Sequence, residues 1–185
     1  MSLSRWGIGC LFPVPGWRRS IHSEVKIPSV LFVCTADRFR SPLAAALFRH
    51  RLEGEPDARD WSVGSAGTWA DPDKVVIPPT RWVASHLHLD LGAHKSRRIN
   101  RELLDTYDLI LVMENNHREG LLVEFPEMEK RLFLLSEVAA GRAYNIPDPH
   151  VQPGDTFQDV ATELSDLIDK GYHNICDLAR RLHDG

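Results

Sequence analysis

Short apolar runs alternate with amphipathic segments along most of this chain. Four of the runs have the length and the apolar character of strands buried in a sheet. The segments between them, and one long segment near the C-terminus, place apolar residues at helical spacing. The predicted strands are Ser29–Val33, Trp61–Ser65, Leu109–Met113 and Arg131–Leu135. The predicted helices are Ser41–Glu53, Thr80–Leu89, His117–Glu124 and a long helix from Thr156 onward.

This alternation predicts an α/β fold. Strands that take turns with helices favour a four-stranded parallel sheet with helices on both faces, which makes three layers. Gly171 lies in the middle of the last predicted helix and is expected to weaken it there. Ligands of open parallel sheets bind at the carboxyl ends of the strands, so the loop after the first strand is the expected place for chemistry.

That loop carries a thiol at one end and a guanidinium at the other. Cys34 ends the first apolar run, Arg40 follows after five residues, and Ser41 and Pro42 open the next helix. Five residues let the loop curl so that its N–H groups and the helix N-terminus surround one anion. The same positive environment stabilises a thiolate, which is the nucleophilic form of cysteine. Arg40 can bind phosphate oxygens through two hydrogen bonds, so one loop can bind a phosphate and attack it.

The loop and several later motifs resemble the low-molecular-weight protein-tyrosine phosphatase family. The family pattern V-C-x-G-N-x-C-R-S-P corresponds to Val33–Pro42. Further segments resemble family motifs in the same order along the chain: Ser65–Thr68, Gly92–Ile99, Asp108–Glu114 and Pro147–Pro149. The resemblance covers about residues 28–183, and residues 28–185 are therefore interpreted as a phosphatase-like catalytic domain.

The resemblance implies hydrolysis of phosphate monoesters, with phosphotyrosine on a protein as the expected substrate, through a cysteinyl-phosphate intermediate. Cys34 is the expected nucleophile, Arg40 the phosphate-binding cation, and Asp148 the general acid and then the general base. This chemistry needs neither a cofactor nor a metal. The remaining expectations are as follows: Thr35, Ala36, Asp37, Arg38, Phe39 and Arg40 bind phosphate, Ser41, Asp37 and His94 support the loop, and Trp69 and His150 line the substrate pocket.

The chain departs from the family pattern at four places. Ala36 replaces a glycine, Asp37 replaces the asparagine that braces the loop, and Phe39 replaces a second cysteine. After Asp148-Pro149 the family's aromatic pair is absent, and His150 follows instead. A carboxylate beside an anion-binding loop is unfavourable unless it is paired or protonated. We therefore expect Asp37 to pair with a protonated histidine, His94.

Composition excludes several other classes of protein. The net charge of −4 gives no reason to expect nucleic acid as a partner. The three cysteines, Cys10, Cys34 and Cys176, are too scattered for a disulfide framework or a zinc site. No apolar run reaches the ~20 residues that a membrane span needs. A reactive thiol suits a reducing compartment, so a cytoplasmic location is expected. No oligomeric state follows from the sequence.

Two other functions, and the role of the N-terminus, stay open at this point. An arsenate reductase would need resolving cysteines, and neither Cys10 nor Cys176 stands at a matching position. Ala36 and Asp37 keep open a catalytically weakened module that binds a phosphate or a phosphoprotein. Among substrates, phosphotyrosine, phosphoarginine and small phosphate esters all remain candidates. We interpret residues 1–27 as an extension that is poorly ordered or added for expression.

Overall fold

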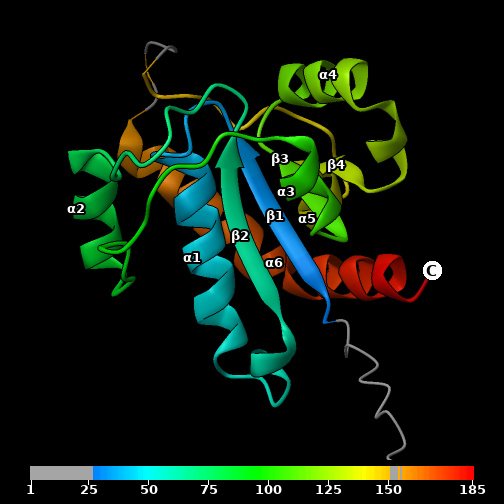
Figure 1. Cartoon of the computed structure of the whole chain (residues 1–185). Coiled ribbons are helices and arrows are strands. Elements are labelled where there is room, and N and C mark those ends of the chain that lie inside the picture. The colour runs from blue at the N-terminus through cyan, green and yellow to red at the C-terminus, as the bar shows by residue number, and fades with distance from the viewer. Residues whose placement is uncertain (1–26, 151–153, 155) are drawn as a thin grey trace, which may run out of the picture.

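The computed structural model describes residues 27–150, 154 and 156–185. Apart from Ile27, the interpreted N-terminal extension lies outside these residues. The described chain forms one parallel sheet of four strands in the order β2-β1-β3-β4 (Figure 1). The strands are β1 (Ser29–Cys34), β2 (Ser62–Gly67), β3 (Leu109–Val112) and β4 (Leu132–Leu134). The helices are α1 (Arg40–Leu52), α2 (Pro78–His86), α3 (Arg101–Asp105), α4 (Asn115–Glu124), α5 (Leu135–Ala140) and α6 (Phe157–Asp184), with 3₁₀ turns at Ala58–Asp60 and Pro126–Lys130.

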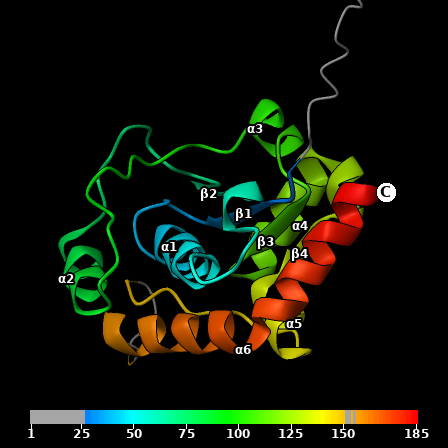
Figure 2. The same ribbon diagram turned by 90° about the horizontal axis from the view of Figure 1, so that it is seen from below.

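Helices cover both faces of the sheet, which confirms the predicted three-layer α/β fold. Helices α1 and α6 lie on one face, and α3 and α4 lie on the other (Figure 2). Alternate residues of β1 enter the two cores: Phe32 packs in the core under α1 and α6, and Leu31 in the core under α3 and α4. Both side chains are fully buried, as expected for the central strand of a parallel sheet.

The strand order places the end of β1 at the centre of the carboxyl edge. The chain leaves β1 toward β2 on one side of it, while β3 pairs with β1 on the other side. Open α/β sheets bind ligands in the crevice formed at such a point. The loop between β1 and α1 therefore occupies the position that sequence reasoning assigned to it.

Two short helices were not predicted. Helix α3 has only five residues, too few to show helical periodicity, although Asn100 caps it by accepting a hydrogen bond from the Leu103 N–H at 2.8 Å. Helix α5 begins directly after β4, so the prediction that Leu135 ends the fourth strand was wrong. Leu135 is fully buried as the first residue of that helix, and an apolar run by itself does not distinguish a buried strand from a buried helical turn.

Gly171 has a packing role rather than a weakening one. Helix α6 runs through it without a break, from a capping box formed by Thr156 and Asp159 to Asp184. A Cβ atom at Gly171 would overlap the Cβ and Cα atoms of Ala139 on α5. The glycine therefore lets the backbones of α5 and α6 approach each other closely.

Gly171→Ala is expected to destabilise the fold, although alanine has a helix propensity about 1 kcal/mol better than glycine. The added methyl group must displace α5, and overpacking of this kind costs about 1–3 kcal/mol. Gly120→Ala in α4 is the matched control, because a Cβ there has no heavy atom within 4 Å, and it should stabilise. Urea unfolding of both variants measures the difference. A stabilised Gly171→Ala variant would contradict the close packing of α5 on α6.

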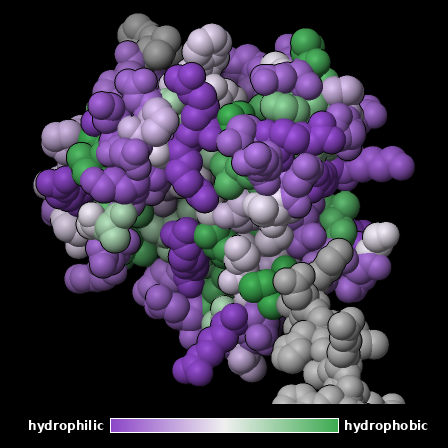
Figure 3. Space-filling model, in the orientation of Figure 1, coloured by the Kyte–Doolittle hydropathy of each residue, from purple (hydrophilic) through white to green (hydrophobic). Residues whose placement is uncertain are grey.

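The outer surface gives no sign of a large apolar face in the view of Figure 1. Hydrophilic residues dominate it, and hydrophobic residues lie in small separate groups (Figure 3). Within the described part of the chain, no helix combines the length and the apolar character that crossing a membrane requires.

Candidate active site

Cys34 lies at the carboxyl end of the central strand, almost fully buried at 3% exposure. Its partner in the neighbouring strand is Gly67. A Cβ atom at Gly67 would lie 2.5 Å from the carbonyl oxygen of Thr35, so a glycine is required where the loop crosses the end of β2. On the other side, the Sγ atom of Cys34 lies 3.0 Å from the hydroxyl oxygen of Ser41, the second residue of α1.

The carbonyl groups of the loop are bound by elements that surround it. Four carbonyl oxygens of the loop each accept a hydrogen bond from a group outside the loop at 2.8–3.3 Å. In a trans peptide the C=O and the following N–H point in opposite directions, so the next N–H in each case is turned toward the inside of the loop. The bound carbonyls belong to Cys34, Thr35, Asp37 and Arg38, and the inward N–H groups to Thr35, Ala36, Arg38 and Phe39.

Helix α1 adds its N-terminus to the same point. Its N-cap residue, Phe39, makes no capping hydrogen bond through its side chain, and the first turn contains no acidic residue. The first N–H groups of a helix have no partner within the helix and carry a partial positive charge. The loop and the helix together therefore form a concave set of donors that suits a phosphate or another small anion.

Arg40 is held by groups from three separate parts of the chain. Its Nη1 atom donates to Glu114 at 2.5 Å and to the Ile146 carbonyl at 2.8 Å. Its Nη2 atom donates to Asp148 at 2.7 Å and lies 3.5 Å from the hydroxyl of Thr35. The Arg40 side chain is only 2% exposed. These contacts fix its plane beside the loop, with the Nη1 side anchored and the Nη2 side next to the expected general acid.

Asp148 is brought to the loop by the segment that precedes α6. Its Oδ1 atom accepts the backbone N–H of His150 at 3.0 Å, while Oδ2 accepts from Arg40. The His150 ring packs edge-on against Phe157, with centroids 4.9 Å apart, and Phe157 packs in the same manner against Phe39, 5.0 Å away. This row of rings connects the loop to the segment that carries Asp148.

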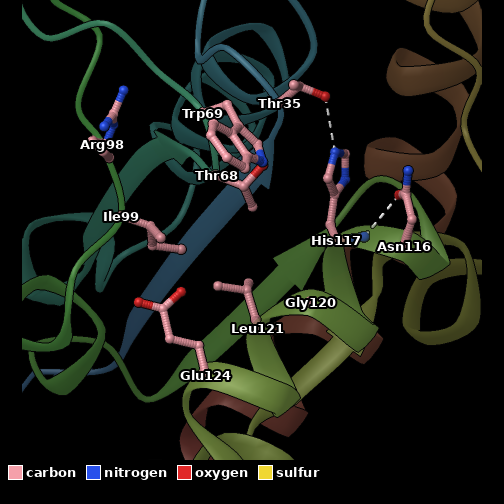
Figure 4. Close-up of a pocket in the computed structure, with 10 residues that line it drawn as sticks. All are labelled: Thr35, Thr68, Trp69, Arg98, Ile99, Asn116, His117, Gly120, Leu121 and Glu124. Atoms are coloured by element: carbon pink, nitrogen blue, oxygen red, sulfur yellow. Dashed lines mark hydrogen bonds between the residues drawn. The ribbon is translucent and has the colours of Figure 1, made fainter.

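Among the described residues, cavities adjoin the loop on two sides. One of ≈ 110 Å³ contains the groups with the expected chemistry, and it is lined by Cys34, Ala36, Arg38, Phe39, Arg40, Ile77, Asp148 and His150. The other, ≈ 560 Å³, lies between the loop and α4, and it touches the catalytic loop only at Thr35 (Figure 4). We assign the site to the smaller cavity, because it holds the thiol, the guanidinium and the carboxyl group together.

Comparison with known proteins decides the family. Residues 29–177 match the family described as low molecular weight phosphotyrosine protein phosphatase. The chain belongs to this family. The low molecular weight protein-tyrosine-phosphatase Wzb of Escherichia coli (strain K12) is 35% identical over 136 residues, which is 74% of this chain and 87% of that protein. The protein-arginine-phosphatase of Bacillus subtilis (strain 168) is 30% identical over 139 residues, 75% of this chain and 91% of its own length.

Solved structures of the family share the fold. The low molecular weight protein tyrosine phosphatase of T. tengcongensis gives a TM-score of 0.70 at 30% identity, over 78% of this chain and 97% of its own. The YwlE arginine phosphatase of Geobacillus stearothermophilus gives a TM-score of 0.69 at 28% identity, over 84% of this chain and 93% of its own. The protein is thus a cysteine-dependent phosphatase, and the names of its relatives include more than one substrate.

The structure gives a physical reason for three of the departures from the family pattern. Ala36 is exposed, and its φ is not among the three positive values found for non-glycine residues in the described chain, so its Cβ fits. Asp37 has φ +54°, a left-handed conformation that Asp and Asn adopt more readily than most other residues. Phe39 fills the buried space beside Phe157. The departures are therefore compatible with an intact loop.

His94 lies beside Asp37, as the sequence suggested, but its hydrogen bond goes to a different atom. The Nε2 atom of His94 is 2.8 Å from the backbone carbonyl oxygen of Asp37 and 3.7 Å from the carboxylate Oδ2. The side chains are within ion-pair distance and beyond hydrogen-bond distance. The carboxyl group of Asp37 instead contacts the Ser41 hydroxyl and the Arg97 backbone N–H, both at 2.9 Å.

Trp69 lies at a different place from the one expected. Its side chain is 77% exposed and lines the larger cavity, and it is not among the residues around Cys34 (Figure 4). Its backbone N–H binds the carbonyl of Thr35 at 2.9 Å, so it supports the loop through its main chain. His150, in contrast, does line the smaller cavity as expected.

Two site residues received no role from the sequence. Glu114 follows β3 and anchors Arg40, and His117 on α4 lies 2.9 Å from the Thr35 hydroxyl through its Nε2 atom (Figure 4). Burial lowers the pKa of His117 to about 4, against the opposing effect of the Glu114 charge. His117 is therefore neutral near pH 7 and adds no cation to the site. Among the described residues, no cluster of His, Cys, Asp and Glu suits a metal ion.

Proposed function

We propose that the protein removes the phosphate from phosphotyrosine on a protein, with Cys34 as nucleophile and Asp148 as general acid. The observation that carries this proposal is the position of both groups in one small cavity, together with Arg40. One related solved structure is a cysteine-to-serine variant of YwlE arginine phosphatase with a phosphorylated active-site serine. That relative supports a covalent phosphate on the nucleophile of this chain.

The proposed reaction has two steps. In the first, loop N–H groups and Arg40 hold the phosphate oxygens, and the Cys34 thiolate attacks phosphorus while the ester oxygen leaves with the proton of Asp148. In the second, the ionised Asp148 takes a proton from water, the water oxygen attacks phosphorus, and the thiolate leaves. Inorganic phosphate is the product, and Asp148 has regained its proton.

Electrostatics explains the arrangement around Arg40. The inward N–H groups of the loop and the Arg40 guanidinium are the donors for the equatorial oxygens, where charge must be stabilised during transfer. Glu114 balances one side of the guanidinium without occupying the side next to Asp148. When Asp148 is protonated to act as an acid, its attraction to the Arg40 guanidinium weakens. The Nη2 group of Arg40 then becomes available to the phosphate.

Arg38 favours an ester of an aromatic alcohol over phosphoarginine. Its side chain lines the small cavity, and its Nε atom is fixed by the Val75 carbonyl at 3.0 Å. A guanidinium held at the entrance disfavours a substrate that brings a second guanidinium group.

A reactive thiolate also favours a reducing compartment, so we place the protein in the cytoplasm.

The arsenate reductase alternative is less favoured. Cys176, the other cysteine in the described chain, is buried on α6, and burial raises the pKa of its thiol. A buried, protonated thiol is a poor resolving nucleophile.

The experiment is a comparison of kcat/KM for one peptide sequence that carries phosphotyrosine or phosphoarginine, measured for wild type and Arg38→Thr. The proposal expects wild type to prefer phosphotyrosine, and the preference to shrink in the variant. Preference of the wild-type protein for phosphoarginine would overturn the substrate assignment. Hydrolysis of neither peptide, nor of p-nitrophenyl phosphate, would leave the binding module as the better description.

A further inference from the structure

One serine hydroxyl lies between the nucleophile and a buried carboxyl group. The Ser41 Oγ atom is 3.0 Å from Cys34 Sγ and 2.9 Å from Asp37 Oδ1, with the Ala66 carbonyl oxygen at 3.2 Å. All three side chains are buried, and those of Asp37 and Ser41 have no exposed surface. A hydroxyl has one proton to donate, so Ser41 can serve only one of these neighbours at a time.

The charge of Asp37 decides which neighbour receives that proton. An ionised Asp37 can only accept hydrogen bonds, and it then competes with the Cys34 thiolate for the Ser41 proton. Two anions would flank a single donor in a buried site, which is unfavourable. A neutral Asp37 carries a proton of its own, which it can donate to Ser41 Oγ. Ser41 is then free to donate its proton to the thiolate.

We propose that Asp37 is a positioning residue that acts in its protonated form, donating from Oδ1 to Ser41 Oγ so that Ser41 donates to the Cys34 thiolate. This inference rests on the proposed role of Cys34 as nucleophile. An asparagine at this position, as in the family pattern, offers N–H donors at every pH. This chain therefore replaces a permanent donor with one that is present only below a certain pH.

Burial favours the neutral form of the Asp37 carboxyl group, whereas its hydrogen bonds favour the ionised form. Its Oδ2 atom accepts the Arg97 N–H at 2.9 Å, and Ser65 of β2 contributes a further hydrogen bond. The Arg97 guanidinium is directed to the Ser65 carbonyl, 2.9 Å away, which leaves His94 as the cationic candidate facing the carboxyl group, at 3.7 Å. Burial raises the pKa of Asp37 despite the lowering effects of these hydrogen bonds and of His94.

The sign of the pH dependence follows from this raised pKa. Below it Asp37 holds its proton, and Asp37→Asn should react like wild type. Above it the wild-type carboxylate draws the Ser41 proton away from Cys34, while the asparagine variant keeps its donor. The ratio of the variant rate to the wild-type rate should therefore be about 1 below this pKa and rise by about 10- to 100-fold as the pH passes above it, the range for one hydrogen bond to a charged group.

Two rates test the proposal. The first is the rate at which iodoacetamide alkylates Cys34, with the modified residue located by mass spectrometry. This measurement needs no substrate, so it tests the proposal even if the phosphatase assignment fails. The second is kcat/KM for p-nitrophenyl phosphate, in which the contribution of Asp148 cancels from the ratio. Asp73→Asn is the matched control, because Asp73 is exposed and also has a positive φ, of 62°. It should leave both rates unchanged.

The Ser41→Ala background separates a hydrogen-bond relay from simple charge repulsion. If Asp37 acts through Ser41, Asp37→Asn should give no rise in either rate once the hydroxyl is absent. A rise that persists in Ser41→Ala would show that the carboxylate acts on the site directly, and would overturn the proposal. The proposal would also be overturned if both rates of Asp37→Asn matched those of wild type at every pH from 5 to 8, or exceeded them by the same factor at every pH.

Discussion

Replacing Cys34 by serine is expected to abolish turnover while phosphate binding persists. The loop N–H groups and Arg40 provide the binding, and neither depends on the thiol. A serine hydroxyl is ionised far less than a thiol near neutral pH, so the nucleophile is lost and kcat should fall by about 10⁴-fold or more. Steady-state hydrolysis of p-nitrophenyl phosphate measures the loss, and calorimetric titration with inorganic phosphate measures the retained binding.

Cys176→Ser is the matched control for this experiment. It makes the same chemical change at the other buried cysteine of the described chain, on α6 beside Tyr172. Full activity in Cys176→Ser together with inactivity in Cys34→Ser assigns the chemistry to one thiol. A Cys34→Ser protein that keeps wild-type kcat would remove the basis for a cysteine nucleophile.

Asp148→Asn is expected to lower kcat by about 10²–10⁴-fold, the usual contribution of a general acid. Asparagine has the size and shape of aspartate but a single acceptor oxygen, so it can keep the hydrogen bond from Arg40 or the one from the His150 N–H, and the cavity keeps its shape. What the variant lacks is a proton for the leaving oxygen. The loss of kcat/KM, which reports the first step, should therefore be much larger for phenyl phosphate, whose leaving group needs protonation, than for p-nitrophenyl phosphate, whose leaving group is stable as an anion.

Asp166→Asn is the matched control, because it makes the same change of a carboxylate to an amide outside the active site. Asp166 is exposed and pairs with Lys170 at 2.6 Å on the surface of α6, and its variant should keep full kcat with both substrates. An Asp148→Asn variant whose kcat/KM falls by the same factor with both leaving groups would indicate a structural role for Asp148, and another group would have to supply the proton.

Local sequence was sufficient for the parts of the molecule that local chemistry determines. The alternation of apolar runs with amphipathic segments gave the parallel sheet, and Cys34, Arg40 and Ser41 could be placed because one short loop fixes their spacing. Asp148 was placed by its resemblance to a family motif. Helix α6 was found because its apolar positions repeat over many turns.

The features that sequence reasoning missed depend on contacts between distant segments. Glu114 reaches Arg40 across 74 residues of sequence, and His117 reaches Thr35 across 82. Gly171 was interpreted as a helix defect because the close approach of Ala139 is a property of the fold. Trp69 was assigned to the substrate pocket from its place in the sequence, but its side chain points into the neighbouring cavity (Figure 4).

The most direct test of the cysteine mechanism is the identity of the phosphorylated atom during turnover. Asp148→Asn provides the material, since it also lacks the base that activates water for the second step, and the intermediate should accumulate with p-nitrophenyl phosphate. Acid quenching within the first turnover, followed by proteolysis and mass spectrometry, locates the phosphate. We expect one phosphate on the peptide that contains Cys34, attached to sulfur and absent from the Cys34→Ser, Asp148→Asn double variant. A phosphate on another residue, or product formed in the first turnover with no phosphoenzyme at all, would contradict the mechanism.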